Sequence, residues 1–487
     1  MGSHTLDISP RFPSVVAGRL RSKSLSSLSA RAFAPVDIAI LAAFRVIYGA
    51  LMLLEMRSFF THDQIRQYYI DPAYHFTYYG FDWVKPLPGP GMYVLFATLM
   101  LLAGCIMLGL WYRVTAALFV LGYSYIFLLD VTRYQNHYYW YACLGLLLAV
   151  IPSHRALSLD ARFRRSLHSD TAPVWALGIL RFQVAVVYAY SGFTKFQGDW
   201  LRGEPMRMWM ADRTGFPLIG HWFTQEWLVY AFSYAGLCLD LLVVPALLWR
   251  RTRPFAFVAA LSFNLMNARL FELDLFPWLM IAALTLFLSP SWPRFRGLWR
   301  PAHRPDAPSR SRRRRGQAVP ASMAALTLTR SQRLTIAFLG AYLAIQLLVP
   351  LRYYLYPGPT RWTEEGFRFS WAMRSRAKWG DGTTFFITDP VSHQQWTVNA
   401  ADDMPFFQFD QMAYLPDLIL QYAHHLADRW RADGYPQVEV RVEAYASLNG
   451  RPSQLLVDPD VDLAAQPRTL LHQPWIAPLT EPLPTGE

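Results

Sequence analysis

The stretch RFQVAVVYAYSGFTKFQGDW, residues 181–200, decides how this chain folds. It is apolar and aromatic for about four helical turns and becomes polar at Gln197 and Asp199. This pattern predicts a membrane-spanning helix with Lys195 at its end. The lysine has two interpretations. It either anchors the span by reaching the membrane surface, or it is a partly desolvated base, because burial lowers the pKa of an amine.

The composition places the whole chain in a class. Of its 487 residues, 53% are hydrophobic and only 16% are charged, which is too apolar for an ordinary soluble protein. The chain is therefore expected to be a membrane protein with a soluble portion. Its cysteines, Cys105, Cys143 and Cys238, lie in apolar runs without zinc spacing. They predict neither a disulfide framework nor a thiolate metal site.

Nine apolar segments are long enough, or nearly so, to cross a bilayer. They are residues 36–56, 92–111, 114–129, 137–152, 174–195, 227–249, 254–270, 273–290 and 334–351. We therefore expect an all-α polytopic bundle of about nine transmembrane helices over residues 36–352.

Basic residues orient this bundle. Residues 1–35 form a basic tail that we expect to be disordered, without the apolar core of a signal peptide. Further basic loops lie around Arg113 and in 153–171, 250–253 and 291–333, the last with RSRRRR at 310–315. Basic loops stay cytoplasmic, so the amino terminus lies inside and everything after residue 352 outside. No nucleic-acid-binding fold surrounds the arginine run, so its partner is anionic lipid. A bacterial inner membrane is the expected location, with the endoplasmic reticulum as its eukaryotic counterpart.

Residues 353–487 predict a small α/β domain outside the membrane. TTFFIT (383–388), QWTV (395–398) and VEVRVEAYA (438–446) are β-branched or alternate in polarity and predict strands. Residues 410–433 predict an amphipathic helix with Pro416 near its start. Asp458, Asp460 and Asp462 lack the glycine and glutamate of a calcium loop, so they are interpreted as turn residues, and no metal is expected.

Charged residues within or beside the spans are a further signal, because charge in apolar surroundings is costly and marks either function or structural pairing. They are Arg45, Glu55, Asp130, Arg133, Arg181, Asp240, Arg269, Glu272 and Asp274. The predicted topology also brings Lys195, Asn136, His137 and Arg269 to one depth, facing the outer domain. A base, a carboxamide, an imidazole and a cation can thus converge there.

At these positions the chain resembles the vitamin K-dependent γ-glutamyl carboxylases. The resemblance lies in FLLDVTRYQNHYYWYACL (127–144), VYAYSGFTKFQGDW (187–200), LMNARLFELDLFPWLM (265–280), FSWAMRSR (369–376), and VDPDVD (457–462) followed by Trp475. The resemblance covers most of the chain. The chain looks like a bacterial-type relative of the family, with the horizontally transferred transmembrane domain. Such relatives share the fold without always sharing the activity.

The resemblance implies roles for individual residues. Lys195 matches the family's essential base, although Thr194 replaces the lysine before it. Asn136 and His137 match the family's N-N-H segment, whose histidine assists the oxygenated vitamin K intermediate. Asn264 replaces the histidine of F-H-x-M-N, while Asn267 is kept. Ser370 and Trp371 match Y-S-W, the segment associated with the substrate glutamate, with Phe369 in place of the tyrosine. The family's cysteine pair between the membrane and outer portions is missing, as is its long carboxyl-terminal region.

The implied activity is carboxylation of peptide glutamate to γ-carboxyglutamate, coupled to quinone epoxidation. The implied cofactor is vitamin K hydroquinone or a menaquinol-type quinol, with O2 and CO2 as co-substrates and no metal. Lys195 and His137 would be catalytic, and Asn136, Asn264, Asn267 and Arg269 would bind the cofactor. Ser370, Trp371, Arg374 and Arg376 would bind a glutamate-containing peptide or protein.

Two other functions stay open. The first is a membrane scaffold or lipid-quinone-binding protein that kept the fold and lost carboxylation, as the changes at Thr194 and Asn264 suggest. The second is a solute transporter, indicated only by the buried charges and without the paired broken helices of that class.

Overall fold

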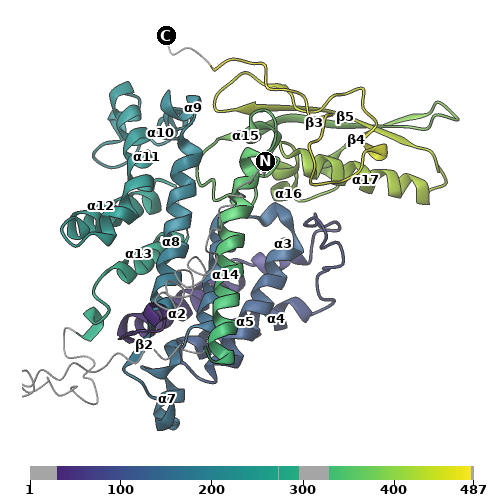
Figure 1. Cartoon of the computed structure of the whole chain (residues 1–487). Coiled ribbons are helices and arrows are strands. Elements are labelled where there is room, and N and C mark those ends of the chain that lie inside the picture. Colours follow the sequence, from purple (N-terminus) through teal and green to yellow (C-terminus); the bar gives the residue numbers. More distant parts are fainter. Residues whose placement is uncertain (1–29, 272–273, 295–327, 484–487) are drawn as a thin grey trace, which may run out of the picture.

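The computed structural model describes residues 30–271, 274–294 and 328–483. Helices dominate its first part, and a small sheet with two helices forms its last part, in agreement with the expected fold class (Figure 1). The long helices are α2 (Ala39–Thr61), α4 (Gly91–Leu108), α5 (Tyr112–Leu129), α6 (Asn136–Val150), α8 (Val174–Lys195), α11 (Glu226–Leu248), α12 (Arg253–Leu270), α13 (Phe276–Leu284) and α14 (Arg330–Leu351).

These nine helices correspond to the nine expected segments, but they differ as membrane spans. Within the described residues, six segments are long and apolar enough to cross a bilayer: α2, α4, α5, α8, α11 and Arg330–Tyr354. Helix α6 has only 15 residues, and α13 has nine before a 3-10 turn at Thr285–Phe287. Helix α12 contains polar residues such as Asn264 and Asn267, which make it less apolar than the other spans. An apolar pattern therefore predicts a helix better than it predicts a complete crossing.

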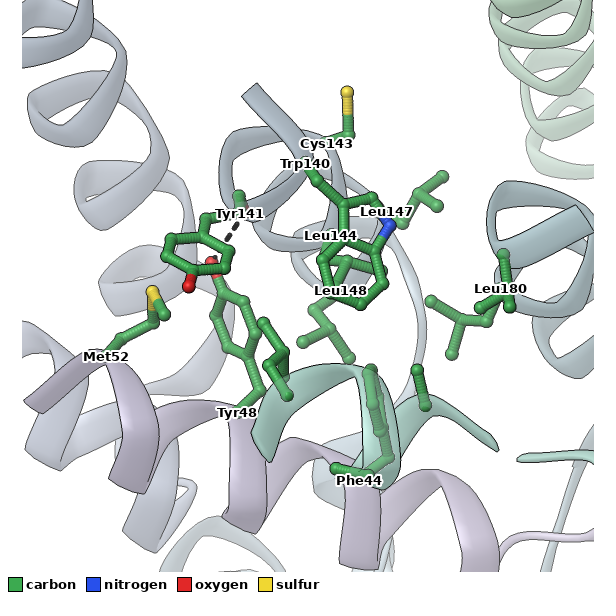
Figure 2. Close-up of a cluster of buried hydrophobic side chains, with 14 of the residues drawn as sticks. Phe44, Tyr48, Met52, Trp140, Tyr141, Cys143, Leu144, Leu147, Leu148 and Leu180 are labelled. Carbon is green, nitrogen blue, oxygen red and sulfur yellow. Dashed lines mark hydrogen bonds between the residues drawn. The ribbon is translucent and has the colours of Figure 1, made fainter. Parts of the chain in front are cut away.

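The bundle core fixes where α6 begins. Figure 2 shows aromatic residues of α2 facing aromatic residues of α6, with the Tyr48 hydroxyl donating to the Tyr141 carbonyl at 2.9 Å. Phe44, Tyr48, Trp140 and Tyr141 are all at most 1% exposed. Large rings buried this completely hold helices at a defined separation, because interiors pack at crystal-like density. The first turn of α6, with Asn136 and His137, is thereby held in place.

The C-terminal domain contains an antiparallel sheet in the order β4-β3-β5-β6. Strands β3 (Lys378–Thr388), β4 (Gln395–Asn399) and β5 (Glu439–Leu448) include the three predicted strands, and β6 (Gln454–Leu455) adds a short edge. Residues alternate between buried and exposed along β5, so one face of the sheet meets the core.

One element of this domain differs from the prediction. The expected helix over 410–433 is two helices, α16 (Phe406–Met412) and α17 (Pro416–Ala432). Pro416 has no backbone N–H to continue α16, but it suits the first position of α17, so the chain breaks before it and restarts.

The domain lies over one end of the bundle, with α16 and α17 between the sheet and the membrane helices (Figure 1). Polar contacts join the two parts: the Thr77 N–H donates to Gln421 Oε1 at 2.9 Å, and Gln408 Nε2 donates to Asp130 Oδ2 at 2.7 Å. Asp130, one of the charges expected near a span, thus holds the outer domain. The arginine run at 310–315, most of the basic tail and Glu272 lie outside the described residues.

Candidate functional site

Lys195, the last residue of α8, forms a buried ion pair with Asp240 of α11. Its Nζ lies 2.5 Å from Asp240 Oδ2 and 2.9 Å from Ser191 Oγ. The Ser191 hydroxyl also donates to Asp240 Oδ2 at 2.7 Å, which closes a triangle of polar groups. Lys195 is only 5% exposed and Asp240 only 4%, so the ammonium does not reach the surface as an anchor would. The amine is therefore shielded, and it is also paired.

Helix geometry explains how the triangle forms. Ser191 and Lys195 are four residues apart and share one face of α8. Gly192, beside them, lets α11 approach: a Cβ at Gly192 would lie 2.6 Å from Leu241 Cδ2 and 3.3 Å from Asp240 Cβ. Sequence analysis found Asp240 as a charge in a span but could not give its partner. The structure adds that the desolvated amine expected there faces a carboxylate at 2.5 Å.

Asn264 of α12 contacts the same face of α8, where Tyr188, Ser191 and Lys195 form a polar stripe. Its Nδ2 donates to the Tyr188 hydroxyl at 3.3 Å and to the Ala260 carbonyl at 2.8 Å. Tyr188 lies one turn before Ser191, so Asn264 extends the polar group away from the helix end. Asn267 is half-buried on the next turn of α12, and the Arg269 side chain is exposed. Of the four cofactor residues predicted, the structure therefore brings only Asn264 to the stripe that carries Lys195.

Trp200 and Asp199 close the outer end of this stripe. The Lys195 Nζ lies 5.1 Å from the centre of the Trp200 ring, whose Nε1 donates to the Ser233 carbonyl at 2.9 Å. Asp199 contacts the C-terminal domain: its carboxylate accepts hydrogen bonds from Arg451 Nη1 at 2.7 Å and Nη2 at 2.8 Å. Burial alone would raise the pKa of Asp199, but Arg451 and Asn449 hold it below its usual value. The segment after Lys195 is thus fastened to the outer domain.

Asn136 and His137 lie on the first turn of α6 and form a second polar and aromatic group. Asn136 Oδ1 accepts from the Tyr134 hydroxyl at 2.9 Å, and that hydroxyl accepts from the Phe369 N–H at 2.7 Å. The His137 ring lies among aromatic rings, 5.6 Å from Phe276 between ring centres. Within the described residues, no hydrogen bond or ion pair connects this group to Lys195. The structure therefore divides the predicted catalytic residues between two neighbouring groups.

Ser370 and Trp371 are internal residues of this second group. They are 1% and 0% exposed. The Ser370 hydroxyl donates to the Phe367 carbonyl at 2.5 Å, and the Trp371 indole stacks on Tyr139 with ring centres 4.7 Å apart. Trp371 Nε1 also donates to Gln346 Oε1 at 3.2 Å. Their side chains pack the segment against α6 and α14, so contact with a substrate stays a prediction.

Arg374 and Arg376 differ in what they can offer a substrate. Arg376 is half-buried and pairs with Glu364, with 2.8 Å between Arg376 Nε and Glu364 Oε1. Its charge is already neutralised. Arg374 is exposed, and its guanidinium lies 4.5 Å from the centre of the Phe271 ring. Within the part of the chain that the structure describes, no acid pairs with Arg374, so of the two it is the one that offers its charge to an anion.

Sequence reasoning missed Ser191, Tyr188, Tyr134 and Gln346 as partners of the site. Ser191 carried a usable signal, since it stands one turn before Lys195. The other partners depend on helix contacts that no local pattern specifies. Among the described residues, no group of three His, Cys, Asp or Glu side chains is placed to hold a metal ion.

The fold and site define a multi-pass helical membrane protein with a C-terminal α/β domain and a lysine–aspartate pair buried at the end of α8. Comparison with family models specifies this class further. Residues 33–292 match the HTTM domain, and residues 331–482 match the lumenal domain of vitamin K-dependent gamma-carboxylase. The chain therefore belongs to the vitamin K-dependent gamma-carboxylase family, which confirms the resemblance seen in the sequence. No solved structure matches the chain.

Proposed function

We propose that this protein converts peptide glutamate to γ-carboxyglutamate, with vitamin K hydroquinone or a menaquinol-type quinol as cofactor and O2 and CO2 as co-substrates. Quinone epoxidation accompanies the reaction. The observation that carries the proposal is the buried Lys195–Asp240 pair, at the position of the family's base in a gamma-carboxylase-like chain.

The residues present suit such a cofactor. A hydroquinone is an apolar ring with phenol-like hydroxyls, whose pKa is about 10 in water. The Lys195 stripe offers a Trp200 ring beside an ammonium and a carboxylate, with the Asn264 carboxamide two turns further in. Lys195 and Asn264 would hold the cofactor. When bound, the hydroquinone and oxygen would together supply a base strong enough to remove a γ-hydrogen from glutamate, which no side chain could do unaided.

The pair determines how Lys195 acts as a base. An ammonium already carries three protons and cannot accept a fourth. Lys195 Nζ can therefore take a proton from the hydroquinone only by passing one of its own protons to Asp240 Oδ2. The transfer would neutralise Asp240 and leave Lys195 as an ammonium that pairs with the group that gave up its proton. The number of buried charges is unchanged, which matters because an additional unpaired charge would be costly in the interior. Ser191 Oγ, bonded to both groups, keeps them aligned.

Other residues would exclude water and hold the peptide. The Trp200 ring covers Lys195, and the outer domain is fastened next to it through Asp199. Exposed Arg374 would attract a glutamate carboxylate, while Ser370 and Trp371 would act by positioning the first turn of α6. His137 and Asn136, on that turn, would stabilise the anion formed on the cofactor, with Asn267 and Arg269 as further contacts.

We also propose the orientation predicted by the basic loops. The amino terminus would face the cytoplasm of a bacterium, and the domain over residues 353–487 would lie outside the inner membrane. The membrane part would then be residues 36–352, after the tail at 1–35.

The test supplies hydroquinone, oxygen, labelled bicarbonate and a glutamate peptide to the purified protein. Wild-type protein is expected to form labelled peptide and quinone epoxide, and Lys195→Ala to form neither. Lys85→Ala, at an exposed lysine, is the matched control and should retain both activities. Labelled peptide that persists in Lys195→Ala would refute the assigned base.

A non-carboxylating scaffold or quinone-binding protein is the second proposal. Thr194 favours it, because the hydroxyl that replaces the family's first lysine is buried and bonds to the Ser191 carbonyl at 3.0 Å. The Lys195–Asp240 pair would then pin α8 to α11. Quinone binding without labelled peptide or epoxide, with several peptides, would support this function over the first.

A further inference from the structure

The segment that joins α8 to α11 contains a loop whose free side is apolar and exposed. The segment begins with α9 (Gly198–Leu201) and α10 (Met206–Ala211), beside the end of α8 that faces the C-terminal domain (Figure 1). It ends in a 3-10 turn at Gly220–Trp222. Leu218 is 91% exposed and Trp222 is 47% exposed. Residues 214–222, which carry both side chains, are called the tip loop below.

The other side of the tip loop is packed, and this packing fixes how the loop is presented. Phe223, directly after the loop, is 0% exposed, and its ring centre lies 5.6 Å from that of Phe216 and 6.0 Å from that of Phe232 in α11. The Gly220 N–H donates to the Phe216 carbonyl at 2.9 Å, which closes the loop. The tip loop is therefore held against α11, with Leu218 on its free side.

The backbone of Leu218 indicates that its side chain is used. Its φ angle is +69°, in the left-handed region that glycine adopts freely and leucine only at a cost. A loop that served only to reverse the chain would have glycine or asparagine at this position. A leucine that is both strained and almost fully exposed therefore points to contact with an apolar partner.

Helix α11 shows which partner lies at this level. Trp227, Tyr230 and Tyr234 are exposed near its start, and their spacing places them on one face of the helix. Trp249 is exposed directly after its end. At 1.5 Å per residue the two tryptophans are about 33 Å apart, close to the ~30 Å thickness of a bilayer's hydrocarbon core. Tryptophan and tyrosine gather at membrane interfaces, so Trp227, shortly after the tip loop, marks one of them.

We propose that the tip loop inserts Leu218 and Trp222 into the bilayer leaflet next to the C-terminal domain, at the boundary between phospholipid headgroups and acyl chains. Leucine and tryptophan are residue types that favour this boundary. The tip loop also connects α8 and α11, two helices that are long and apolar enough to cross a bilayer. The inference goes beyond the proposed function, because lipid contact needs neither quinol nor turnover.

Lipid contact at the tip loop would also act on the Lys195 site. One apolar cluster joins Phe223 to Met210 and Trp200. The Trp200 ring lies over Lys195 Nζ. A tip loop held in the leaflet therefore holds one wall of the site at the membrane surface.

Nitroxide labels test the insertion in the full-length protein in phospholipid nanodiscs, after the three native cysteines have been replaced by alanine. Leu218→Cys and Trp222→Cys carry the label in the tip loop. Leu101→Cys is the lipid reference, because Leu101 is 68% exposed in the apolar helix α4. Val391→Cys is the water reference, because Val391 is 74% exposed in the loop after β3. Oxygen concentrates in hydrocarbon and a polar nickel chelate stays in water, so the ratio of their effects on the label reports its surroundings.

The labels at positions 218 and 222 should give an oxygen-to-nickel ratio severalfold above that at 391 and close to that at 101. A ratio at 218 equal to that at 391 would overturn the inference. So would a label shielded from both reagents, which would mean that a second copy of the chain or another protein covers the tip loop. If Leu218→Cys does not fold, the label at 222 answers the same question by the same criteria.

Leu218→Asp, combined with the label at position 222, tests whether the leucine holds the tip loop in the lipid. A carboxylate is costly in the apolar part of a bilayer, so the ratio at 222 should fall to the water value. Val391→Asp is the matched control and should leave the ratio at 222 unchanged. A ratio at 222 that stays high in Leu218→Asp would contradict the role given to Leu218 and overturn the inference.

Discussion

Asp240 Oδ2 lies 2.5 Å from Lys195 Nζ, and Ser191 Oγ is hydrogen-bonded to both atoms. The two charged residues are on different helices and are buried together. A buried pair of this kind adds little stability relative to a well-packed apolar pair, but it is costly to break from one side. The pair at the end of α8 therefore adds little net stability to the fold, which is compatible with the proton transfer proposed above.

Asp240→Asn tests that relationship. It leaves a buried ammonium without a carboxylate, so we expect a destabilisation of about 3–5 kcal/mol and a loss of carboxylation of about 100-fold or more. Thermal unfolding in detergent and the labelled-bicarbonate assay measure the two effects. Lys195→Met combined with Asp240→Asn should recover most of the stability but none of the activity. A single variant as stable as wild type would contradict the pairing.

Gly192→Leu tests the close approach of α8 and α11. Even a Cβ at this position would lie 2.8 Å from Leu241 Cγ, so a larger side chain must displace α11 and stretch the Lys195–Asp240 pair. We expect loss of activity and a destabilisation of about 1–3 kcal/mol. Gly178→Ala is the control on the same helix, where a Cβ meets nothing within 4 Å. It should be neutral or stabilising through helix propensity. Wild-type activity in Gly192→Leu would show that the approach is not needed.

Arg451→Met tests the attachment of the outer domain. The variant removes both guanidinium hydrogen bonds to Asp199, each worth about 1.5–3 kcal/mol when a charged group is involved. We expect faster proteolysis between the two parts and a raised KM for peptide. Asp199→Asn should have a similar effect, and the double variant should add little to either change. Additive effects in that cycle would mean that the two residues act independently.

Lys378 predicts how stability depends on pH. Burial lowers the pKa of this β3 lysine to about 7, although Glu364 nearby opposes the shift. The unfolded state, with an ordinary lysine pKa near 10.4, therefore binds more protons between pH 7 and 10. Stability should rise across this window and be lowest, for this group, below pH 7. Lys378→Met should flatten the rise in melting temperature, whereas Lys85→Met should not. An unchanged slope in Lys378→Met would assign the dependence to another group.

Much of the candidate site could be predicted from the sequence. The rest could not, and the reason is physical. Lys195 stood out because an apolar run ends there, and Asn264 and His137 because they occupy positions matched by the family. The pairing of Arg376 with Glu364 and the burial of Trp371 against Tyr139 could not be predicted, because they depend on which surfaces meet.

The sequence by itself determined the helical membrane architecture, the strands of the C-terminal domain and the family. These properties depend on local periodicity and motif spacing, which are written along the chain. Only the tertiary structure decided that Asp240 faces Lys195, that Asp199 holds Arg451, and that one proline-broken pair of helices lies under the sheet. Each of these depends on how separate helices and loops pack, and a lysine at the end of a helix carries no information about which neighbour will face it.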